Sequence, residues 1–256
     1  MSRDVYCLEL ELGSPPASSD EYLHLDGPLS YAAGVESIGH DGLDELTEGG
    51  EPEYFADEMP LARYESGDDW VWACSAAAIA RTDDGTLRTE REWNTKRWRC
   101  RFDHEPQHQA KNTQVATSSG PYKAYDAALP YVQTDTLVFL YEPAPDVDPV
   151  RPAHMIDAHV PHIGKKGSQG YGMIRDMHLY DVSSYIDSAI YHDGRVLRSL
   201  PASFANAVPS GVTMQRRTTK PPYWHAYNQD MAFPPFSEID RSYFEELLER
   251  DLLAAD

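Results

Sequence analysis

The sequence predicts an α+β fold, and three features of its patterning support this prediction. Residues 5–12 alternate between leucines and glutamates, which is typical of a strand with one buried face. A short helical segment, a glycine-rich loop and a second alternating stretch follow one another between residues 155 and 180. Residues 240–253 carry an apolar stripe at helical spacing. The order strand, helix, loop and strand is that of half a ferredoxin-like unit.

Three segments are expected after the opening strand. Asp26 is of a helix-capping residue type and Pro28 follows in the first turn, which predicts a short apolar helix. Residues 37–69 are rich in glycine and acidic side chains, and we expect them to form an acidic surface insertion. Residues 70–81 are apolar and aromatic, which indicates a central strand.

A basic stretch follows in the middle of the chain. Residues 88–101 alternate as in an extended ribbon, and residues 82–119 are expected to form a basic, thumb-like insertion. Arg97, Arg99 and Arg101 share one face of the predicted strand. Such a row matches the spacing of phosphates and predicts contact with RNA. The alternative is an exposed edge strand that is protected by charge.

The second half of the chain contains further expected elements, and we expect residues 1–256 to form one domain. The segment of residues 237–256 contains the closing helix. The other elements are a strand at residues 136–141, a helix at residues 155–162, and two strand-like pieces, 185–192 and 195–200, on either side of Asp193-Gly194.

The composition is that of an acidic, globular protein. Acidic residues outnumber basic residues 42 to 22, for a formal charge of −20, which suggests a host with a salty cytoplasm. The three cysteines (Cys7, Cys74 and Cys100) have no metal-binding spacing and make no even disulfide set, which favours a reducing cytosol. We find no signal peptide and no apolar run near 18 residues, so a cytoplasmic protein without a membrane partner is expected.

The charges are unevenly distributed along the chain. Residues 1–69 hold 18 acidic and two basic residues. Residues 81–123 hold nine basic and six acidic residues, and residues 161–236 hold eight basic and five acidic residues. An acidic total therefore does not exclude a nucleic-acid partner.

Residues 163–174 form the most informative stretch. Glycine permits positive φ angles, exposed amides in such a loop bind anions, and Tyr171 offers a face for base stacking. The stretch fits neither the Walker nor the dinucleotide-binding pattern. We interpret it as a polyanion-binding loop, and a glycine-rich hairpin with solvated lysines is the alternative. The candidate contacts are Gly164, Lys165, Lys166, Ser168, Gln169, Gly170, Tyr171 and Gly172.

Other candidate residues lie outside the loop. Arg216, Arg217 and Lys220 precede an aromatic cluster, and Tyr122 and Lys123 follow a turn. His24 has three possible roles: catalytic base, RNA contact or hydrogen-bonded structural histidine. The pair of histidines at 104 and 108 is interrupted by a proline, so no metal site is expected.

Three segments resemble, in chain order, a known family of CRISPR-associated proteins. The loop resembles the glycine-rich loop of the RAMP superfamily. The ordered set is similar to the RAMP subunit of type IV CRISPR systems that takes the place of the Cas-five group, and it spans residues 5–230. The segments are His24-Leu25-Asp26-Gly27-Pro28-Leu29-Ser30-Tyr31-Ala32, Gly120-Pro121-Tyr122-Lys123-Ala124-Tyr125, and residues 163–172.

The resemblance implies a modified ferredoxin-like or RRM fold with insertions. It further implies a non-catalytic subunit that binds the 5′ handle of the CRISPR RNA and caps one end of an effector complex. The implied partners are a neighbouring backbone RAMP subunit and the large subunit. No cofactor and no metal are expected.

Two other functions remain open. Some RAMP proteins cleave CRISPR RNA without a metal, through acid–base chemistry on the 2′-hydroxyl. In that case His24, Lys123 and His162 are the candidate catalytic groups, although no spacing selects a pair. The second alternative is an acidic halophilic protein that has no nucleic-acid role.

Overall fold

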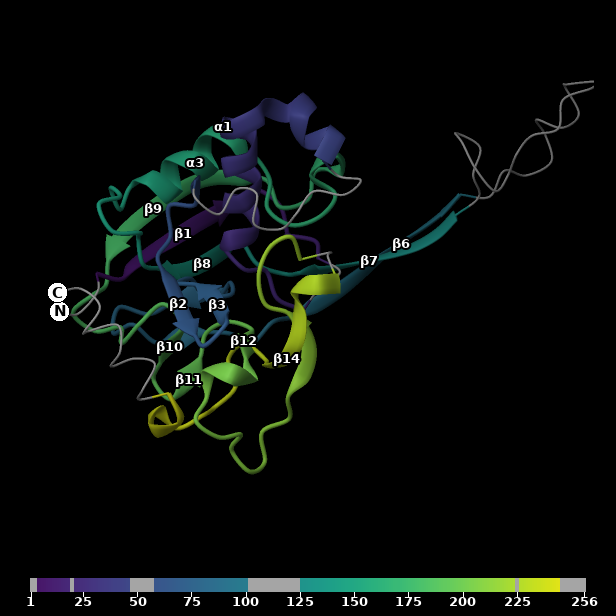
Figure 1. Ribbon diagram of the computed structural model, residues 1–256. Coiled ribbons are helices and arrows are strands. Elements are labelled where there is room, and N and C mark those ends of the chain that lie inside the picture. The colour runs from purple at the N-terminus through teal and green to yellow at the C-terminus, as the bar shows by residue number, and fades with distance from the viewer. Residues whose placement is uncertain (1–3, 19–20, 47–57, 101–124, 224–225, 245–256) are drawn as a thin grey trace, which may run out of the picture.

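The computed structural model describes residues 4–18, 21–46, 58–100, 125–223 and 226–244 (Figure 1). Two α-helices and several short antiparallel sheets make up the described residues, which confirms the α+β class. Neither of these helices has an apolar stretch long enough to cross a bilayer.

The central sheet has β1 (Tyr6–Leu12) in the middle, between β8 (Thr136–Tyr141) and β9 (Ile174–Asp181). Both neighbours run antiparallel to β1. Leu10 of β1 lies opposite Leu137 on one side and Met177 on the other, so the leucines of the predicted strand share one buried face. The strands predicted at residues 5–12 and 136–141 are confirmed.

Two helices, α1 (Asp26–Leu46) and α3 (Arg151–His159), cover the leucine face of this sheet (Figure 1). Leu29 of α1 and Met155 of α3 are fully buried in the same core cluster as the sheet leucines. Burial of each such side chain stabilises the fold by about 1.5–3 kcal/mol. The predicted helix before the glycine loop is therefore present, although it begins and ends earlier than residues 155–162.

Residues 73–78 run antiparallel beside β8, on the side away from β1. The Ser75 amide donates to the carbonyl of Leu140 (2.8 Å), and the Ala78 amide donates to the carbonyl of Val138 (2.8 Å). The long strand predicted at residues 70–81 is thus divided into shorter pieces. Its ends belong to two hairpins: β2 (Arg63–Ser66) with β3 (Asp69–Trp72), and β4 (Ala80–Arg81) with β5 (Leu87–Arg88).

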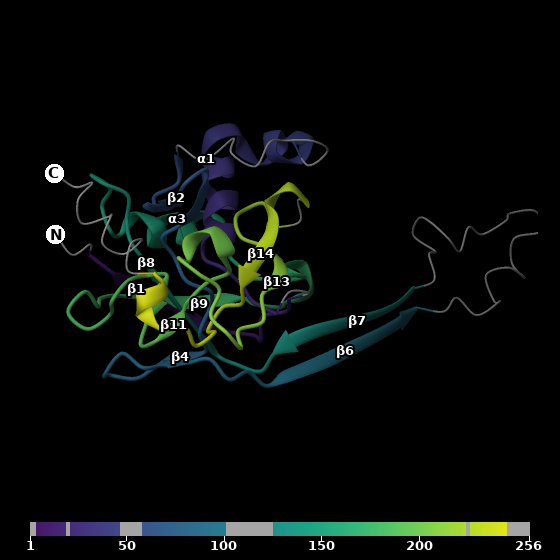
Figure 2. The same cartoon turned by 60° about the horizontal axis from the view of Figure 1, so that its bottom comes forward.

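A two-stranded ribbon projects from the body of the protein, as Figures 1 and 2 both show. Its strands, β6 (Trp93–Cys100) and β7 (Tyr125–Val132), pair along their whole length. The predicted basic ribbon at residues 82–119 accordingly includes β6, while its partner strand comes from beyond that range. Residues 101–124 lie outside the described residues.

The C-terminal half adds a second core, built around Phe204, Phe233 and Phe244. The turn at Asp193-Gly194 joins two paired strands, as predicted. The elements of this half are β10 (Tyr191–His192), β11 (Arg195–Val196), β12 (Leu200–Pro201), β13 (Gln215–Thr218) and β14 (Gln229–Phe233), with the 3-10 turns η3 (Ala202–Phe204), η4 (Ala226–Asn228) and η5 (Arg241–Tyr243).

Two further expectations, the acidic insertion at residues 37–69 and the C-terminal helix at residues 237–256, fall partly outside the residues that the structure describes. The described part of residues 37–69 contains the end of α1 and a buried segment, in which Leu61 and Tyr64 are 2% and 3% exposed. The sparse apolar residues there are the ones that pack into the cores. The predicted C-terminal helix at residues 237–256 begins as the 3-10 turn η5, because the Asp240 side chain accepts from the Ser242 amide in a tight cap. Residues 245–256 lie outside the described residues.

Candidate nucleic-acid interface

The glycine-rich loop connects α3 to β9 and contains the 3-10 turn η2 (Gly167–Gln169). Gly164 and Gly172 have φ angles of +85° and +63°. A Cβ atom on Gly172 would overlap the carbonyl oxygen of Ile163, and one on Gly164 would overlap that of Ala17. Only glycine fits at these two positions, because both the φ angle and the close approach exclude a side chain.

Most of the loop amides hold the loop in place. The Lys165 amide donates to the carbonyl of Ala17 (2.6 Å), and the Gly172 amide donates to that of Pro15 (3.0 Å). The Gln169 and Gly170 amides bond within the loop. Fewer amides are therefore available to bind an anion than the sequence predicted. Among the described loop residues, the amides of 166–168 make no hydrogen bond within the protein. Lys165, Lys166, Ser168 and Gln169 are exposed and surround them.

The loop lies beside the base of the ribbon. The ring centroids of Tyr171 and Tyr131 are 5.9 Å apart, and Tyr131 belongs to β7. Ala17 forms β-bridges to both Tyr131 and Lys165. Ala17 therefore contacts both the glycine-rich loop and the base of the basic ribbon through backbone pairing.

A cleft of about 440 Å³ brings together two of the three segments that carry the family resemblance. One wall comes from the start of α1, including Gly27, Pro28 and the half-exposed Tyr31. The other wall comes from the end of α3 and the loop, including His162 and Lys165. These segments are about 130 residues apart in the chain, and the packing of α1 against α3 places them side by side.

A second hollow of about 340 Å³ adjoins the cleft. Tyr22, His24 and Tyr223 line both hollows and form the partition between them. Arg216 and Arg217 line the second hollow. Two of the three basic residues predicted after residue 210 therefore line a hollow that adjoins the cleft of the glycine-rich loop.

His24 is fixed within this partition. Its side chain is buried, its Nε2 accepts from the Ser199 amide (3.1 Å), and its ring stacks on Tyr223 at 5.0 Å with an interplanar angle of 12°. Burial, and then the charge of Arg198, hold the pKa of His24 well below its usual value. This geometry is that of a buried, hydrogen-bonded histidine.

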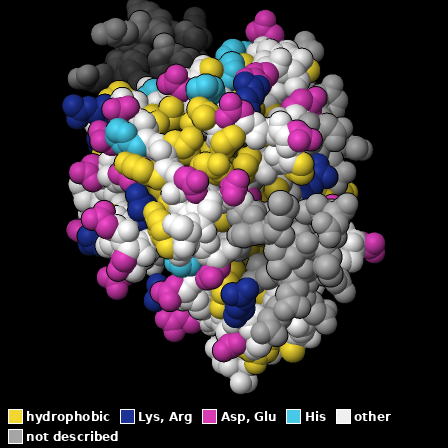
Figure 3. All heavy atoms as spheres, turned by 90° about the vertical axis from the view of Figure 1, so that its left-hand side faces the viewer, with side chains coloured by type: hydrophobic (Ala, Val, Ile, Leu, Met, Phe, Trp, Pro, Cys, Tyr) yellow, Lys and Arg dark blue, Asp and Glu magenta, His cyan; other side chains and the backbone are white. Residues whose placement is uncertain are grey.

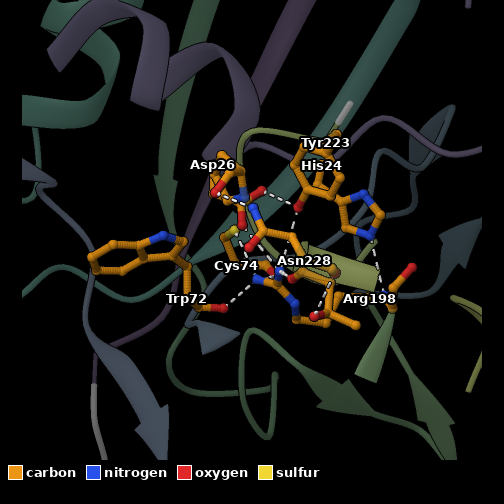
Figure 4. Close-up of polar contacts among 10 residues, drawn as sticks. His24, Asp26, Trp72, Cys74, Arg198, Tyr223 and Asn228 are labelled. Carbon is orange, nitrogen blue, oxygen red and sulfur yellow. Dashed lines mark hydrogen bonds and ion pairs between the residues drawn. The ribbon is translucent and has the colours of Figure 1, made fainter. Parts of the chain in front are cut away.

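A buried ion pair holds Tyr223 of this partition in place (Figure 4). Arg198 and Asp26 are both fully buried, and Arg198 Nη2 lies 3.0 Å from Asp26 Oδ2. The Tyr223 hydroxyl donates to Asp26 Oδ1 (2.6 Å). Arg198 also donates to the carbonyls of Trp72, Cys74 and Thr219. Burial raises the pKa of Tyr223 well above its usual value, and the charge of Asp26 raises it further.

Sequence reasoning did not find this network. Asp26 was interpreted as a helix cap, whereas its carboxylate binds a guanidinium 172 positions away in the chain. The one local signal was an arginine inside the apolar segment of residues 196–200, where an unpaired charge is not tolerated.

The remaining predicted residues are divided among several environments. Arg97 is exposed on β6, and Arg99 lies on the same strand. Arg217 pairs with Glu21 (2.7 Å) and lies over the Tyr22 ring, and Lys220 lies over the Trp70 ring at 4.4 Å. Lys220 therefore lines neither of the two hollows. Arg101, Tyr122 and Lys123 lie outside the described residues.

Fold and site together define an α+β protein in which a glycine-rich loop, beside the base of a projecting basic ribbon, lines a cleft that adjoins a second hollow with two arginines. The family model for CRISPR type IV associated protein Csf3 matches residues 7–235. The chain therefore belongs to this family of CRISPR-associated proteins.

Two further comparisons add little. A search of curated proteins gave no match. Among solved structures, the chain is similar to a chain of the cryo-EM structure of the type III-B Cmr-beta complex bound to cognate target RNA, with 11% identity and a TM-score of 0.36. That match covers 70% of this chain and 61% of the other.

Proposed function

We propose that this protein is a non-catalytic subunit of a type IV CRISPR ribonucleoprotein that binds the 5′ handle of the CRISPR RNA. The observation that carries the proposal is the cleft between the start of α1 and the glycine-rich loop, since both walls are segments of the family resemblance. The second hollow, with Arg216 and Arg217, extends the same surface.

The chemistry of the cleft suits single-stranded RNA. Lys165, Lys166 and the amides of residues 166–168 supply donors for a phosphate. Tyr31 is 45% exposed and provides an aromatic face at the rim for a base. Single-stranded RNA is recognised by stacking and by hydrogen bonds to base edges, with each stacked base contributing on the order of 1–3 kcal/mol.

The acidic total charge is compatible with this function. The side of the molecule away from the ribbon carries many more acidic than basic side chains around an apolar area (Figure 3). In molar salt the Debye length is about 3 Å, so charges remote from the RNA contribute little to its binding. Direct contacts from the loop and the second hollow then decide the affinity.

The proposal extends to the fold and the partners. The order β9, β1, β8 and residues 73–78, all antiparallel, supports a modified ferredoxin-like fold of the RAMP type. We propose that the ribbon and the acidic, partly apolar side serve contacts with a backbone RAMP subunit and the large subunit, in a salt-adapted cytoplasm.

The test is a fluorescence anisotropy titration of the handle RNA at molar salt. Lys165→Ala with Lys166→Ala should weaken binding about tenfold or more, because each lost charge-assisted hydrogen bond costs about 1.5–3 kcal/mol. The matched control is Arg195→Ala with Arg241→Ala, which removes two exposed arginines from the C-terminal half and should leave affinity within about twofold. Equal affinities for all three proteins would contradict the proposal.

The same RNA tests the non-catalytic role. Incubation of the protein with repeat RNA in EDTA should leave the RNA intact, because His24 Nε2 already accepts a backbone hydrogen bond within the partition. Metal-independent cleavage that is lost in His162→Ala would instead show a processing nuclease.

A further inference from the structure

The face of the central sheet that points away from the two helices carries polar side chains at its β1–β9 end. Glu9 and Glu11 of β1 share this face, and Glu11 lies directly opposite Asp176 of β9. His178, two residues further along β9, has the same orientation and lies opposite Glu9. The glycine-rich loop and the two hollows do not include any of these residues.

Three of these side chains converge. One potential ligand atom from each of Glu11, Asp176 and His178 lies within 4.8 Å of the other two. His178 Nε2 is 3.1 Å from Glu11 Oε1. Ligand atoms that bind a zinc ion at about 2.0–2.2 Å lie roughly 3–4 Å from one another, so small side-chain rotations are sufficient to bring all three within reach of one ion.

The repulsion between the two carboxylates is offset only in part by His178, which lies 3.1 Å from Glu11. Like charges directly opposite each other on paired strands are destabilising, and Glu11 and Asp176 form such a pair. Glu9 adds a third carboxylate to the same face. The register of the β1–β9 pair shifts between Glu11 and Leu12, directly beside this group. Bulges commonly re-aim side chains next to functional sites.

We propose that Glu11, Asp176 and His178 bind one divalent transition-metal ion of the zinc class. Two carboxylates and an imidazole suit zinc and its neighbours, whereas magnesium prefers an all-oxygen set. The side chains of His178 and Glu11 are 39% and 47% exposed, so an ion enters directly from solvent. Water completes its coordination. Two paired strands hold the three ligands, which makes the site more rigid than one built on a loop.

The experiment is isothermal titration of the full chain with Zn²⁺ at pH 7.5, with Mg²⁺ in parallel. We expect one site whose affinity falls about tenfold or more in Glu11→Gln and in His178→Ala, with no Mg²⁺ binding at equal concentration. Glu9→Gln is the matched control, because it removes one negative charge from the same face but none of the three proposed ligands. It should change the affinity for Zn²⁺ less than threefold.

Co²⁺ locates the ion independently of affinity. Paramagnetic broadening of amide NMR signals should be strongest around residues 11 and 176–178 and should disappear in His178→Ala. Absence of Zn²⁺ binding, equal losses in Glu9→Gln and Glu11→Gln, or broadening centred on other histidines would each overturn the proposal. Circular dichroism identifies any variant that fails to fold, and Asp176→Asn then replaces that variant.

Discussion

Arg198 illustrates how much depends on a single buried residue. Its guanidinium joins α1, the end of β3 and the C-terminal half, because it donates to Asp26, to the carbonyl of Trp72 and to that of Thr219. Burial lowers the pKa of the guanidinium, but Asp26, Cys74 and Tyr223 together raise it above its usual value, so the group stays charged. This arrangement also positions Tyr223, which accepts from Arg198 and donates to Asp26.

Replacement of this arginine should destabilise the fold severely. Arg198→Met leaves the carboxylate of Asp26 buried without its partner, and breaking such a pair costs about 3–5 kcal/mol. Urea denaturation measures the loss. Arg195→Met is the control, because Arg195 is in an exposed pair with Glu238 and should cost less than about 1 kcal/mol.

The double variant Asp26→Leu with Arg198→Met separates the ion pair from the packing. It removes both charges and should regain part of the stability lost in Arg198→Met, since hydrophobic replacement of a whole buried pair is often neutral or stabilising. A double variant that is less stable than the single one would show that the hydrogen bonds to the carbonyls, rather than the missing charge partner, dominate.

At the scale of elements, the glycine-rich loop is rigid because chain segments on both sides hold it. Gly172 has a positive φ angle and no room for a side chain, whereas Gly170 also has a positive φ angle but has open space around it. Alanine substitutions at the two positions therefore distinguish the cost of backbone strain from the cost of steric overlap.

Gly172→Ala should destabilise the protein more than Gly170→Ala. A left-handed conformation costs a non-glycine residue about 1–3 kcal/mol, and only Gly172→Ala adds a clash with the carbonyl of Ile163. Hydrogen exchange of the loop amides, with thermal unfolding as the global measure, checks this order. Equal effects of the two substitutions would mean that the loop adapts freely and that its shape is not imposed by Gly172.

The same loop shows what a sequence reveals and what it conceals. Periodicity predicted β1 and β8, and the turn at Asp193-Gly194 predicted its hairpin, because each signal is local. The anchoring of Lys165 on Ala17 could not be predicted, since it depends on backbone atoms about 150 positions apart. The buried segment around Leu61 was missed for a related reason: few apolar residues in an acidic stretch were taken as a sign of exposure.

The same limit applies to the candidate site. The loop residues could be selected from composition and from the family resemblance. The partition of Tyr22, His24 and Tyr223 could not be, because it forms only when the second half of the chain packs against the first. Residues from opposite ends of the sequence meet there without any shared motif.

At the scale of the whole molecule, charge repulsion opposes compaction. The formal charge is −20, and residues 1–69 alone hold 18 acidic residues against two basic ones. Within the described residues, the ion pairs are mostly exposed, and only that of Arg198 and Asp26 is fully buried. Exposed pairs contribute little to stability, so they offset only a small part of the repulsion.

Added salt should therefore stabilise this protein. Between about 0.01 M and 0.1 M ionic strength the Debye length falls from about 30 Å to about 10 Å, which screens repulsion across most of the surface. An increase in unfolding free energy on the order of 1 kcal/mol corresponds to roughly 2–4 °C in Tm. Calorimetry in sodium chloride and in sodium perchlorate distinguishes the causes, because screening acts equally in both salts at these concentrations, whereas strengthened hydrophobic burial depends on the anion. A Tm that falls in both salts would mean that attractive pairs outweigh the repulsion.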